Sequence, residues 1–231
     1  MSAPKAVLLV LAKAPVPGQV KTRLCPPLTS AQAARLAAAA LLDTLDAVLA
    51  VPHSAVVVAL AGELDRAEQA EALRAALPAT SVIGQHGTSL GARIAAAHAE
   101  TGVLFPGRPV LQIGMDTPQV DARLLGHCLD VLDRPGVDAT LGPAHDGGWW
   151  ALGVRDPALA GLIAEVPTSR PDTGAKTWAA LHAAGCRVAG LPELFDVDTA
   201  ADAAMVAADA PAGRFAPTVA ALLASTAGGV R

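Results

Sequence analysis

The sequence predicts an α/β fold: a mostly parallel, twisted sheet with helices on both faces and an antiparallel edge element. Three observations lead to this prediction. Short β-branched apolar runs alternate with longer alanine- and leucine-rich stretches through the first 132 residues. Two strand-like runs then follow one another across a loop, which favours an antiparallel pair. The chain has 231 residues, of which 52% are hydrophobic, enough for a large core.

The first half of the chain alternates strand and helix signals. Thr29 and Gln32 form a capping-box pattern at the start of the first helix, and Pro78 closes the second. The expected strands are Ala6–Leu11, Ser54–Ala61, Ser81–Gly84 and Val110–Gly114. The expected helices are Thr29 to about Leu49, Leu64–Leu77, Ser89–Glu100 and Asp121–Leu132.

The second half departs from this rhythm. Asp138–Leu141 and Trp149–Val154 are the two strand candidates of the antiparallel pair. A helix over Asp172–Ala184 and a strand over Cys186–Leu191 follow, and Thr199 is the expected N-cap of the next helix.

The chain shows no linker, repeat or low-complexity segment that would divide it. We therefore expect a single domain over residues 1–231, with a core from about 5 to 210. Residues 211–231 are expected to hold a C-terminal helix to about Ala224 and a frayed tail from Ser225.

The composition limits the classes of function. The net charge of −4 and the pI of about 5.8 argue against nucleic-acid binding, which needs a basic face. No uninterrupted apolar stretch reaches the roughly 20 residues that span a membrane. The three cysteines form no CxxC motif and are more simply small buried residues, so we expect a cytoplasmic protein.

The most informative segment is the loop after the first strand, AKAPVPGQVKTRL, which begins at residue 12. Two prolines stiffen it, and it carries Lys13, Lys21 and Arg23. The first 42 residues have a net charge of +5, whereas the remainder has −9. Because α/β sheets bind ligands at the carboxyl ends of their strands, this loop predicts a site for a nucleotide diphosphate or triphosphate.

A P-loop is a competing interpretation of the same residues. Lys21 and Thr22 match the end of that motif, but Val20 stands where the motif has glycine. A degenerate P-loop NTPase is therefore disfavoured.

Aspartates follow two of the later strands. Asp116 ends the strand at Val110–Gly114, where it could bind Mg²⁺ or Mn²⁺ beside a diphosphate or simply cap a turn. Asp196 and Asp198 lie on an extended segment, so both carboxylates could face one site, or they could form a solvated turn before a helix.

Two glycine-rich segments complete the candidate site. In His145–Trp150 (HDGGWW), Asp146 could accept a proton or hydrogen bond from a hydroxylated acceptor, with Trp149 against a sugar face. A plain hairpin turn is the alternative. Gly87–Arg93 (GTSLGAR) opens a helix whose backbone N–H groups could receive phosphate, although Arg93 alone is a weak signal.

Five segments in order, AKAPVPGQVKTRL, GTSLGAR, GMDTP, LGPAHDGGWWALG and FDVDT, resemble a bacterial GT-A-like glycosyltransferase family long described as a domain of unknown function. Some of its members are assigned to sugar transfer in arsenosugar biosynthesis. The resemblance runs from about Val7 to about Met205. The family is similar to nucleotide-diphospho-sugar transferases and small nucleotidyltransferases. It implies a Rossmann-like GT-A fold, a nucleotide donor, a small-molecule acceptor and Mg²⁺ or Mn²⁺.

The resemblance also implies roles for individual residues. The metal ligands would be Asp116 and Asp198. The catalytic residues would be Asp146, Lys21 and Arg23. The nucleotide would be bound by Ala12, Lys13, Ala14, Pro15, Gly18, Lys21, Thr22, Arg23, Gly91 and Arg93. The acceptor would be bound by Asp146, Gly147, Gly148 and Trp149.

The chain departs from the family pattern on the acceptor side. Trp149 and Trp150 replace tyrosines that are common in the family, and a tryptophan often found near position 167 is absent. The acceptor is therefore not carried over from relatives. Sugar transfer from a nucleotide-diphospho-sugar is the favoured activity. The alternatives are nucleotidyl transfer from a nucleoside triphosphate and a nucleotide-binding protein without turnover.

Overall fold

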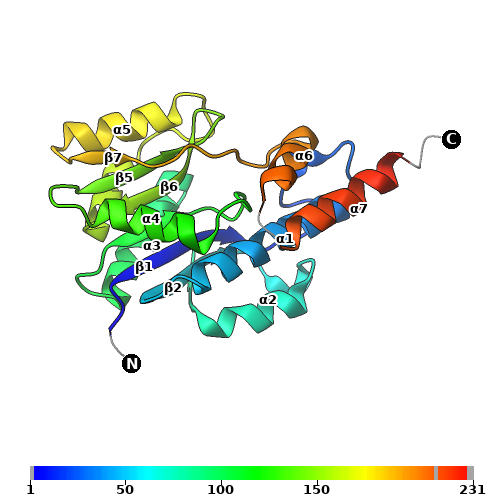
Figure 1. Ribbon diagram of the computed structural model, residues 1–231, viewed down its shortest axis with the longest axis horizontal. Helices are drawn as coiled ribbons and strands as arrows, with labels where there is room; N and C mark the ends of the chain where they lie inside the picture. Colours follow the sequence, from blue (N-terminus) through cyan, green and yellow to red (C-terminus); the bar gives the residue numbers. More distant parts are fainter. Residues whose placement is uncertain (1–2, 211–212, 228–231) are drawn as a thin grey trace.

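The computed structural model describes residues 3–210 and 213–227. Its centre is a seven-stranded sheet in the order β3-β2-β1-β4-β6-β5-β7 (Figure 1). Every neighbouring pair is parallel except those of β6, which is antiparallel to β4 and β5. The strands are β1 Ala6–Lys13, β2 Ser54–Ala61, β3 Ser81–Gly84, β4 Val110–Ile113, β5 Ala139–Pro143, β6 Trp149–Val154 and β7 Val188–Gly190.

Helices connect most of these strands and cover both faces of the sheet, and the last two helices follow β7. They are α1 Ser30–Leu49, α2 Ala70–Ala76, α3 Leu90–Leu104, α4 Ala122–Leu132, α5 Thr173–Ala183, α6 Ala200–Asp209 and α7 Phe215–Ala227. Short 3-10 turns lie at Thr22–Leu24, Leu64–Arg66, Leu77–Ala79 and Pro157–Ile163. None of the helices in the described ranges is both long and apolar enough to cross a membrane.

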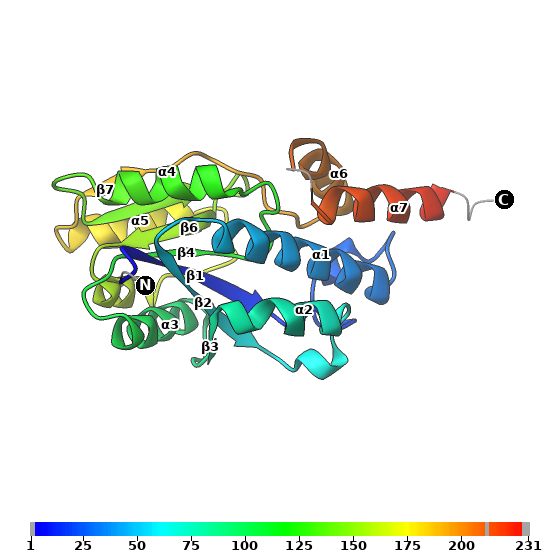
Figure 2. The same ribbon diagram turned by 60° about the horizontal axis from the view of Figure 1, so that its bottom comes forward.

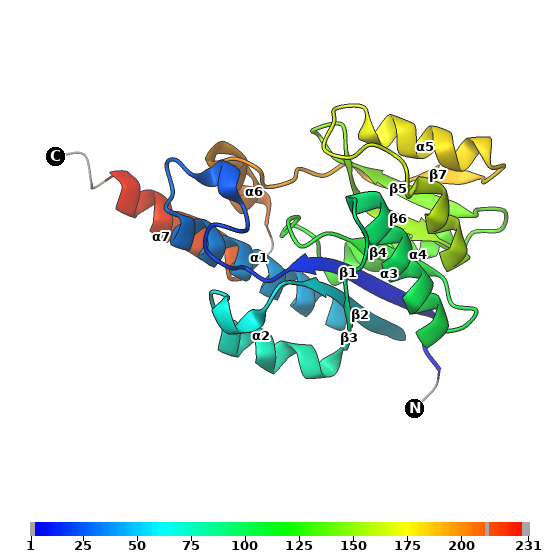
Figure 3. The ribbon, with the colours of Figure 1, turned by 180° about the vertical axis from the view of Figure 1, so that it is seen from behind.

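The two faces of the sheet bury separate apolar clusters because side chains alternate along each strand. Leu8 and Val10 of β1 face a cluster that includes residues of α1, α2 and α4. Val7 and Leu9 face the opposite cluster, with residues of α3 and of the turn Pro157–Ile163. Figure 2 shows α1, α2 and α4 on the face of the first cluster, and Figure 3 shows α3 and α5 covering the opposite face of the sheet.

A third apolar cluster holds the C-terminal helices beyond the sheet. In Figure 1, α6 and α7 extend past the carboxyl ends of β1 and β2, alongside α1. The buried carboxylate of Asp43 on α1 accepts backbone hydrogen bonds from Arg214 and Phe215, each 2.8 Å at its shortest. These bonds satisfy N–H groups at the start of α7 that have no partner within the helix.

Chain order reverses between β1 and β4, which lie side by side although β2 and β3 come between them in sequence. Such a switch point leaves a crevice outside the carboxyl ends of the two strands. The loop that follows β1 and the residue pair Met115–Asp116 that follows β4 both reach this crevice. The fold therefore places the basic loop and Asp116 together.

The structure confirms the predicted fold class and refines its elements. The antiparallel strand is β6, which lies inside the sheet rather than at its edge; β7 is the edge strand on that side. The Thr29–Gln32 capping box and the Thr199 N-cap are present. The predicted frayed tail is helical as far as Ala227, and residues 228–231 lie outside the described ranges.

The predicted helix Leu64–Leu77 is wrong as a single element. It divides into a 3-10 turn, the helix α2 and a second 3-10 turn. Gln69 adopts the left-handed conformation with φ 54°, which interrupts the helix. Just before it, the backbone N–H of Glu68 donates a 2.9 Å hydrogen bond to the carbonyl of Pro15. The break therefore ties this segment to the basic loop.

His98 on α3 is completely buried beneath the sheet, and burial lowers its pKa to about 4, only partly opposed by Gln112. The neutral imidazole is favoured in the folded state. The free energy of unfolding is therefore highest above the unfolded pKa of about 6.5, and it falls as the pH drops toward 4, because the unfolded chain takes up a proton that the folded protein does not. Between pH 7.5 and 4.5 the native protein should lose roughly 2.5 kcal/mol more unfolding free energy than a His98→Leu variant. Urea unfolding at both pH values measures this difference. Parallel pH profiles for the two proteins would contradict the assignment.

Candidate active site

The crevice at the switch point is a cavity of about 670 Å³. It is lined on one side by the basic loop and on the other by the Asp146–Trp150 segment and the loop before α5. Of the predicted site residues, those that line it are Ala12, Lys13, Lys21, Thr22, Arg23, Arg93, Asp116, Asp146, Gly148, Trp149 and Asp198. Asp196 lines it as well.

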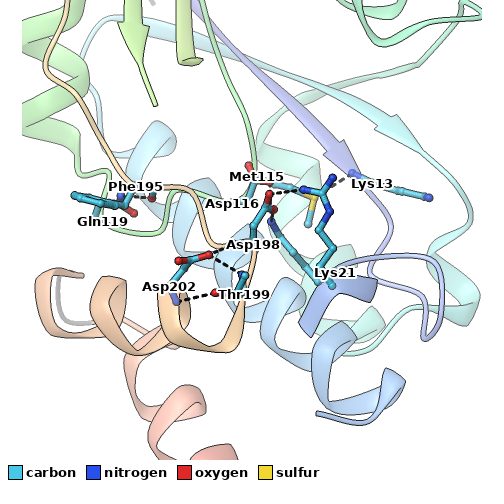
Figure 4. A network of polar contacts seen from close by, with 10 residues as sticks. Lys13, Lys21, Met115, Asp116, Gln119, Phe195, Asp198, Thr199 and Asp202 are labelled. Atoms are coloured by element: carbon cyan, nitrogen blue, oxygen red, sulfur yellow. Dashed lines mark hydrogen bonds and ion pairs between the residues drawn. The ribbon is translucent and has the colours of Figure 1, made fainter. Parts of the chain in front are cut away.

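A network of ion pairs joins four of the residues that line the cavity, and Figure 4 shows it from close by. The Lys21 Nζ lies 2.9 Å from Asp116 Oδ2 and 3.5 Å from Asp198 Oδ1. The Arg23 Nη1 lies 2.8 Å from Asp198 Oδ2. Lys21 has left-handed backbone geometry, with φ 47°, at the start of the 3-10 turn that also holds Arg23. The structure thus joins the β1 loop, the end of β4 and the segment before α6.

The charges in this network are unequally balanced. Burial alone would lower the pKa of Lys21, but the ion pair with Asp116 raises it above its ordinary value, so the ammonium stays charged. Burial, followed by the nearby carboxylates of Asp116, Asp146 and Asp198, raises the pKa of Asp196 well above its usual range. Asp196 therefore keeps its proton to a higher pH than an ordinary aspartate, because its buried carboxyl lies among other carboxylates.

Other residues of the basic loop hold it in shape, and some of them do not line the cavity. Lys13 Nζ donates a 2.8 Å hydrogen bond to the carbonyl of Gln19, across the loop. Ala14 and Pro15 are buried, and Gly18 has φ 77°, a conformation suited to glycine. These three predicted nucleotide-binding residues lie outside the cavity lining.

The Asp146-Gly147-Gly148 turn packs against the loop before α5. A Cβ at Gly147, where φ is 86°, would overlap the carbonyl oxygen of Pro171. A Cβ at Gly174 would lie 2.6 Å from the carbonyl oxygen of Gly148. Asp146 Oδ1 accepts a 2.7 Å hydrogen bond from the Gly148 N–H, which orients the carboxylate. Close packing thus explains Gly147, which does not line the cavity.

The two tryptophans point to opposite faces of β6. Trp150 is buried and donates a 2.8 Å hydrogen bond from Nε1 to the carbonyl of Pro192. Trp149 is half-buried, lines the cavity, and donates from Nε1 to Thr177 Oγ1 at 3.1 Å. The hairpin interpretation is therefore correct for the backbone, while Trp149 lines the cavity.

Two predicted nucleotide-binding residues lie at the start of α3, and one of them lines the cavity. Arg93 lines the cavity, and its Nε donates a 3.2 Å hydrogen bond to the carbonyl of Gly87. Gly91 is buried instead, because a Cβ there would lie 2.5 Å from the carbonyl oxygen of Ala164. Gly91 thus lets α3 pack closely against the turn that follows β6, away from the cavity.

Sequence reasoning missed several polar residues of the cavity. Gln85 follows β3, and the rule that ligands bind at carboxyl ends of strands could have found it. Arg170 and Ser169 belong to the loop before α5, and the latter has φ 58°. Gln112 lies within β4, where its apolar neighbours gave no signal.

The donor set is suited to a divalent cation that a nucleotide also binds. In the described part of the chain, no three acidic, histidine or cysteine side chains converge closely enough to hold a metal by themselves. Asp116 and Asp198 nevertheless line one cavity, together with Asp196. Mg²⁺ typically takes one or two carboxylates and completes its shell with phosphate oxygens and water.

Several solved structures share this fold. A protein of Desulfovibrio desulfuricans G20 described as a candidate nucleotide-diphospho-sugar transferase is 26% identical, with a TM-score of 0.82 over 97% of this chain and 98% of that one. A mannosyltransferase of Pyrobaculum calidifontis in complex with GDP-mannose and Mn²⁺ is 13% identical (TM-score 0.52; 100% and 77% covered). CMP:2-keto-3-deoxy-manno-octonic acid synthetase with CTP is 14% identical (TM-score 0.51; 85% and 94% covered).

These likenesses define the class: an α/β protein with the fold shared by GT-A glycosyltransferases and nucleotidyltransferases, similar to transferases. More particularly, residues 44–170 match the bacterial family described as "uncharacterized protein conserved in bacteria (DUF2064)", and the chain belongs to this family. No protein with curated function matches it.

Proposed function

We propose that the protein is a cation-dependent transferase that takes a sugar from a nucleotide-diphospho-sugar and transfers it to a small-molecule acceptor. The observation that carries this proposal is the Lys21–Asp116–Asp198 network, with Nζ–Oδ distances of 2.9 and 3.5 Å, in the switch-point cavity. The likeness to the nucleotide-diphospho-sugar transferase candidate supports it.

Lys21 and Arg23 have two sets of possible partners in this proposal. In the free protein they neutralise Asp116 and Asp198. A bound diphosphate offers both side chains phosphate oxygens as partners. Lys21 then stabilises the charge that builds on the leaving diphosphate. Because Lys21 has moved from Asp116 and Asp198 to the phosphate, these two carboxylates become free to bind a cation.

Asp116 and Asp198 would hold Mg²⁺ or Mn²⁺, with Asp196 close by. When bound, the ion neutralises the charge of the diphosphate leaving group. The Mn²⁺-bound mannosyltransferase of the same fold supports this choice of ion.

Asp146 is the proposed base for the acceptor. Its Oδ1 is held by the Gly148 N–H at 2.7 Å, and the residue lines the same cavity as Trp149. The acceptor oxygen attacks the anomeric carbon as the bond from that carbon to the diphosphate oxygen breaks. The acceptor proton passes to the Asp146 carboxylate.

Nucleotidyl transfer is the second candidate. Lys21 and Arg23 both contact Asp198, so their two charges lie close enough together to stabilise a departing pyrophosphate equally well. The CTP-bound synthetase with the same fold supports this alternative.

A ligand screen separates the candidates. Thermal unfolding is followed with nucleoside triphosphates or nucleotide-sugars, each with and without Mn²⁺, because a ligand of the native state raises its stability. Selective Mn²⁺-dependent stabilisation by one nucleotide-sugar supports sugar transfer. Stabilisation by a nucleoside triphosphate but by no nucleotide-sugar indicates nucleotidyl transfer. Stabilisation by neither would contradict both.

An Asp116→Asn variant is expected to lose the Mn²⁺-dependent part of nucleotide affinity, about tenfold or more, because one charged ligand becomes neutral. Calorimetric titration with and without Mn²⁺ measures this part. The matched control is Asp130→Asn, which removes the same charge from the exposed face of α4. Equal Mn²⁺ dependence in all three proteins would exclude Asp116 as a ligand.

A further inference from the structure

Gln85 holds its side-chain amide in one orientation at the edge of the cavity. Its Nε2 donates two hydrogen bonds of 2.8 Å, one to the carbonyl of Ala12 on β1 and one to the carbonyl of Ala59 on β2. Carbonyl oxygens only accept hydrogen bonds, so the amide nitrogen must face them. The position of the amide oxygen follows from this chemistry.

The oxygen of this amide is available to a ligand. Gln85 lines the cavity and is half-buried. Its Oε1 makes no hydrogen bond to any residue in the described ranges. This oxygen is not among the buried atoms that lack a partner, so it is accessible from the cavity. It is an acceptor whose direction is set by two strands of the sheet. A group that binds there must donate a hydrogen bond.

The same cavity extends from Gln85 to the cations of the basic loop, along the carboxyl ends of β1, β2 and β3. A nucleotide whose diphosphate lies at Lys21 and Arg23 has its base at the other end of the molecule. Ala12 and Ala61, which also line the cavity, offer small side chains and backbone near Gln85. Lys13, which pairs with Ala61 in the sheet, holds its Nζ on the carbonyl of Gln19.

We propose that Gln85 is a specificity-determining residue that recognises the nucleobase of the donor by accepting a hydrogen bond from a base N–H at Oε1. This inference rests on the proposed function, since it assumes a nucleotide in the cavity. The recognised group is an exocyclic amine or a ring imide N–H. The amide of Gln85 cannot turn over to offer a donor without breaking both bonds to Ala12 and Ala59.

The test removes the hydrogen bond between the base and Gln85 in two ways: by methylating the base N–H and by replacing the side chain of Gln85. The affinities of ADP, CDP, GDP and UDP are first measured by calorimetry in the presence of Mn²⁺. The tightest of them is then compared with its N-methylated analogue, such as N3-methyl-UDP or N4,N4-dimethyl-CDP, on the native protein and on Gln85→Met. The native protein is expected to bind the methylated analogue at least about tenfold more weakly. The variant is expected to bind both equally.

Two results would overturn the proposal: equal affinity for both ligands on the native protein, or the same loss on the variant as on the native protein. Pyrophosphate affinity serves as the control, because it should not change in Gln85→Met if only the base contact is lost. The comparison on the native protein needs no variant, so poor folding of Gln85→Met leaves the first result decisive. If none of the four diphosphates binds, the proposed function fails and this inference with it.

Discussion

A Lys21→Met variant is expected to bind a nucleoside diphosphate roughly 10- to 100-fold more weakly than the native protein, because one charge-assisted contact to phosphate is lost. Its affinity for the corresponding nucleoside should not change. In the absence of nucleotide, its affinity for Mn²⁺ should instead rise, because Asp116 and Asp198 lose the ammonium that lies 2.9 and 3.5 Å from them. Calorimetric titrations with each ligand measure all three affinities.

The opposite signs of these effects are the decisive feature. Lys5→Met is the matched control, since Lys5 is exposed just before β1, at the other end of that strand from the cavity. If Lys21 served only to hold the loop in place, the Lys21→Met variant would lose affinity for diphosphate and for Mn²⁺ together. Equal losses for nucleoside and diphosphate would also exclude contact between Lys21 and phosphate.

Replacing Gly147 with alanine is expected to destabilise the protein by roughly 3 kcal/mol, from left-handed backbone strain and an overlap that must be relieved. Gly147 has φ 86°, and the atom that its Cβ would meet is the backbone carbonyl oxygen of Pro171, which cannot rotate away like a side chain. Urea unfolding measures the change. The loop before α5 should also move, so ligand affinity on the acceptor side should fall.

Gly126 provides the control for this substitution. It lies inside α4 without positive φ, and a Cβ there would meet nothing within 4 Å. Gly126→Ala should therefore stabilise the protein by roughly 0.5–1 kcal/mol through the greater helix propensity of alanine. A similar small effect at both glycines would show that the Gly147 turn is not tightly packed against Pro171.

Much of the cavity was accessible to sequence reasoning because the carboxyl ends of parallel strands share one edge of a sheet. That rule brought Lys21 and Asp116 to one site although 95 residues separate them, and the structure pairs them. It did not reveal that Lys21 occupies the space between Asp116 and Asp198, because a side-chain partner depends on the path of the loop. The sequence suggested Gly91 as a phosphate contact, whereas packing against Ala164 accounts for it.

Hydrophobic periodicity, caps and turn residues are local properties, so they were enough to predict the α/β fold, most element positions and the charged residues available to the cavity. Four features became visible in three dimensions alone: the place of β6 within the sheet, the break at Gln69, the anchoring of α7 by Asp43 and the orientation of Gln85. Each of these depends on hydrogen bonds or packing between residues far apart in the chain, and such contacts leave no periodic pattern in the sequence.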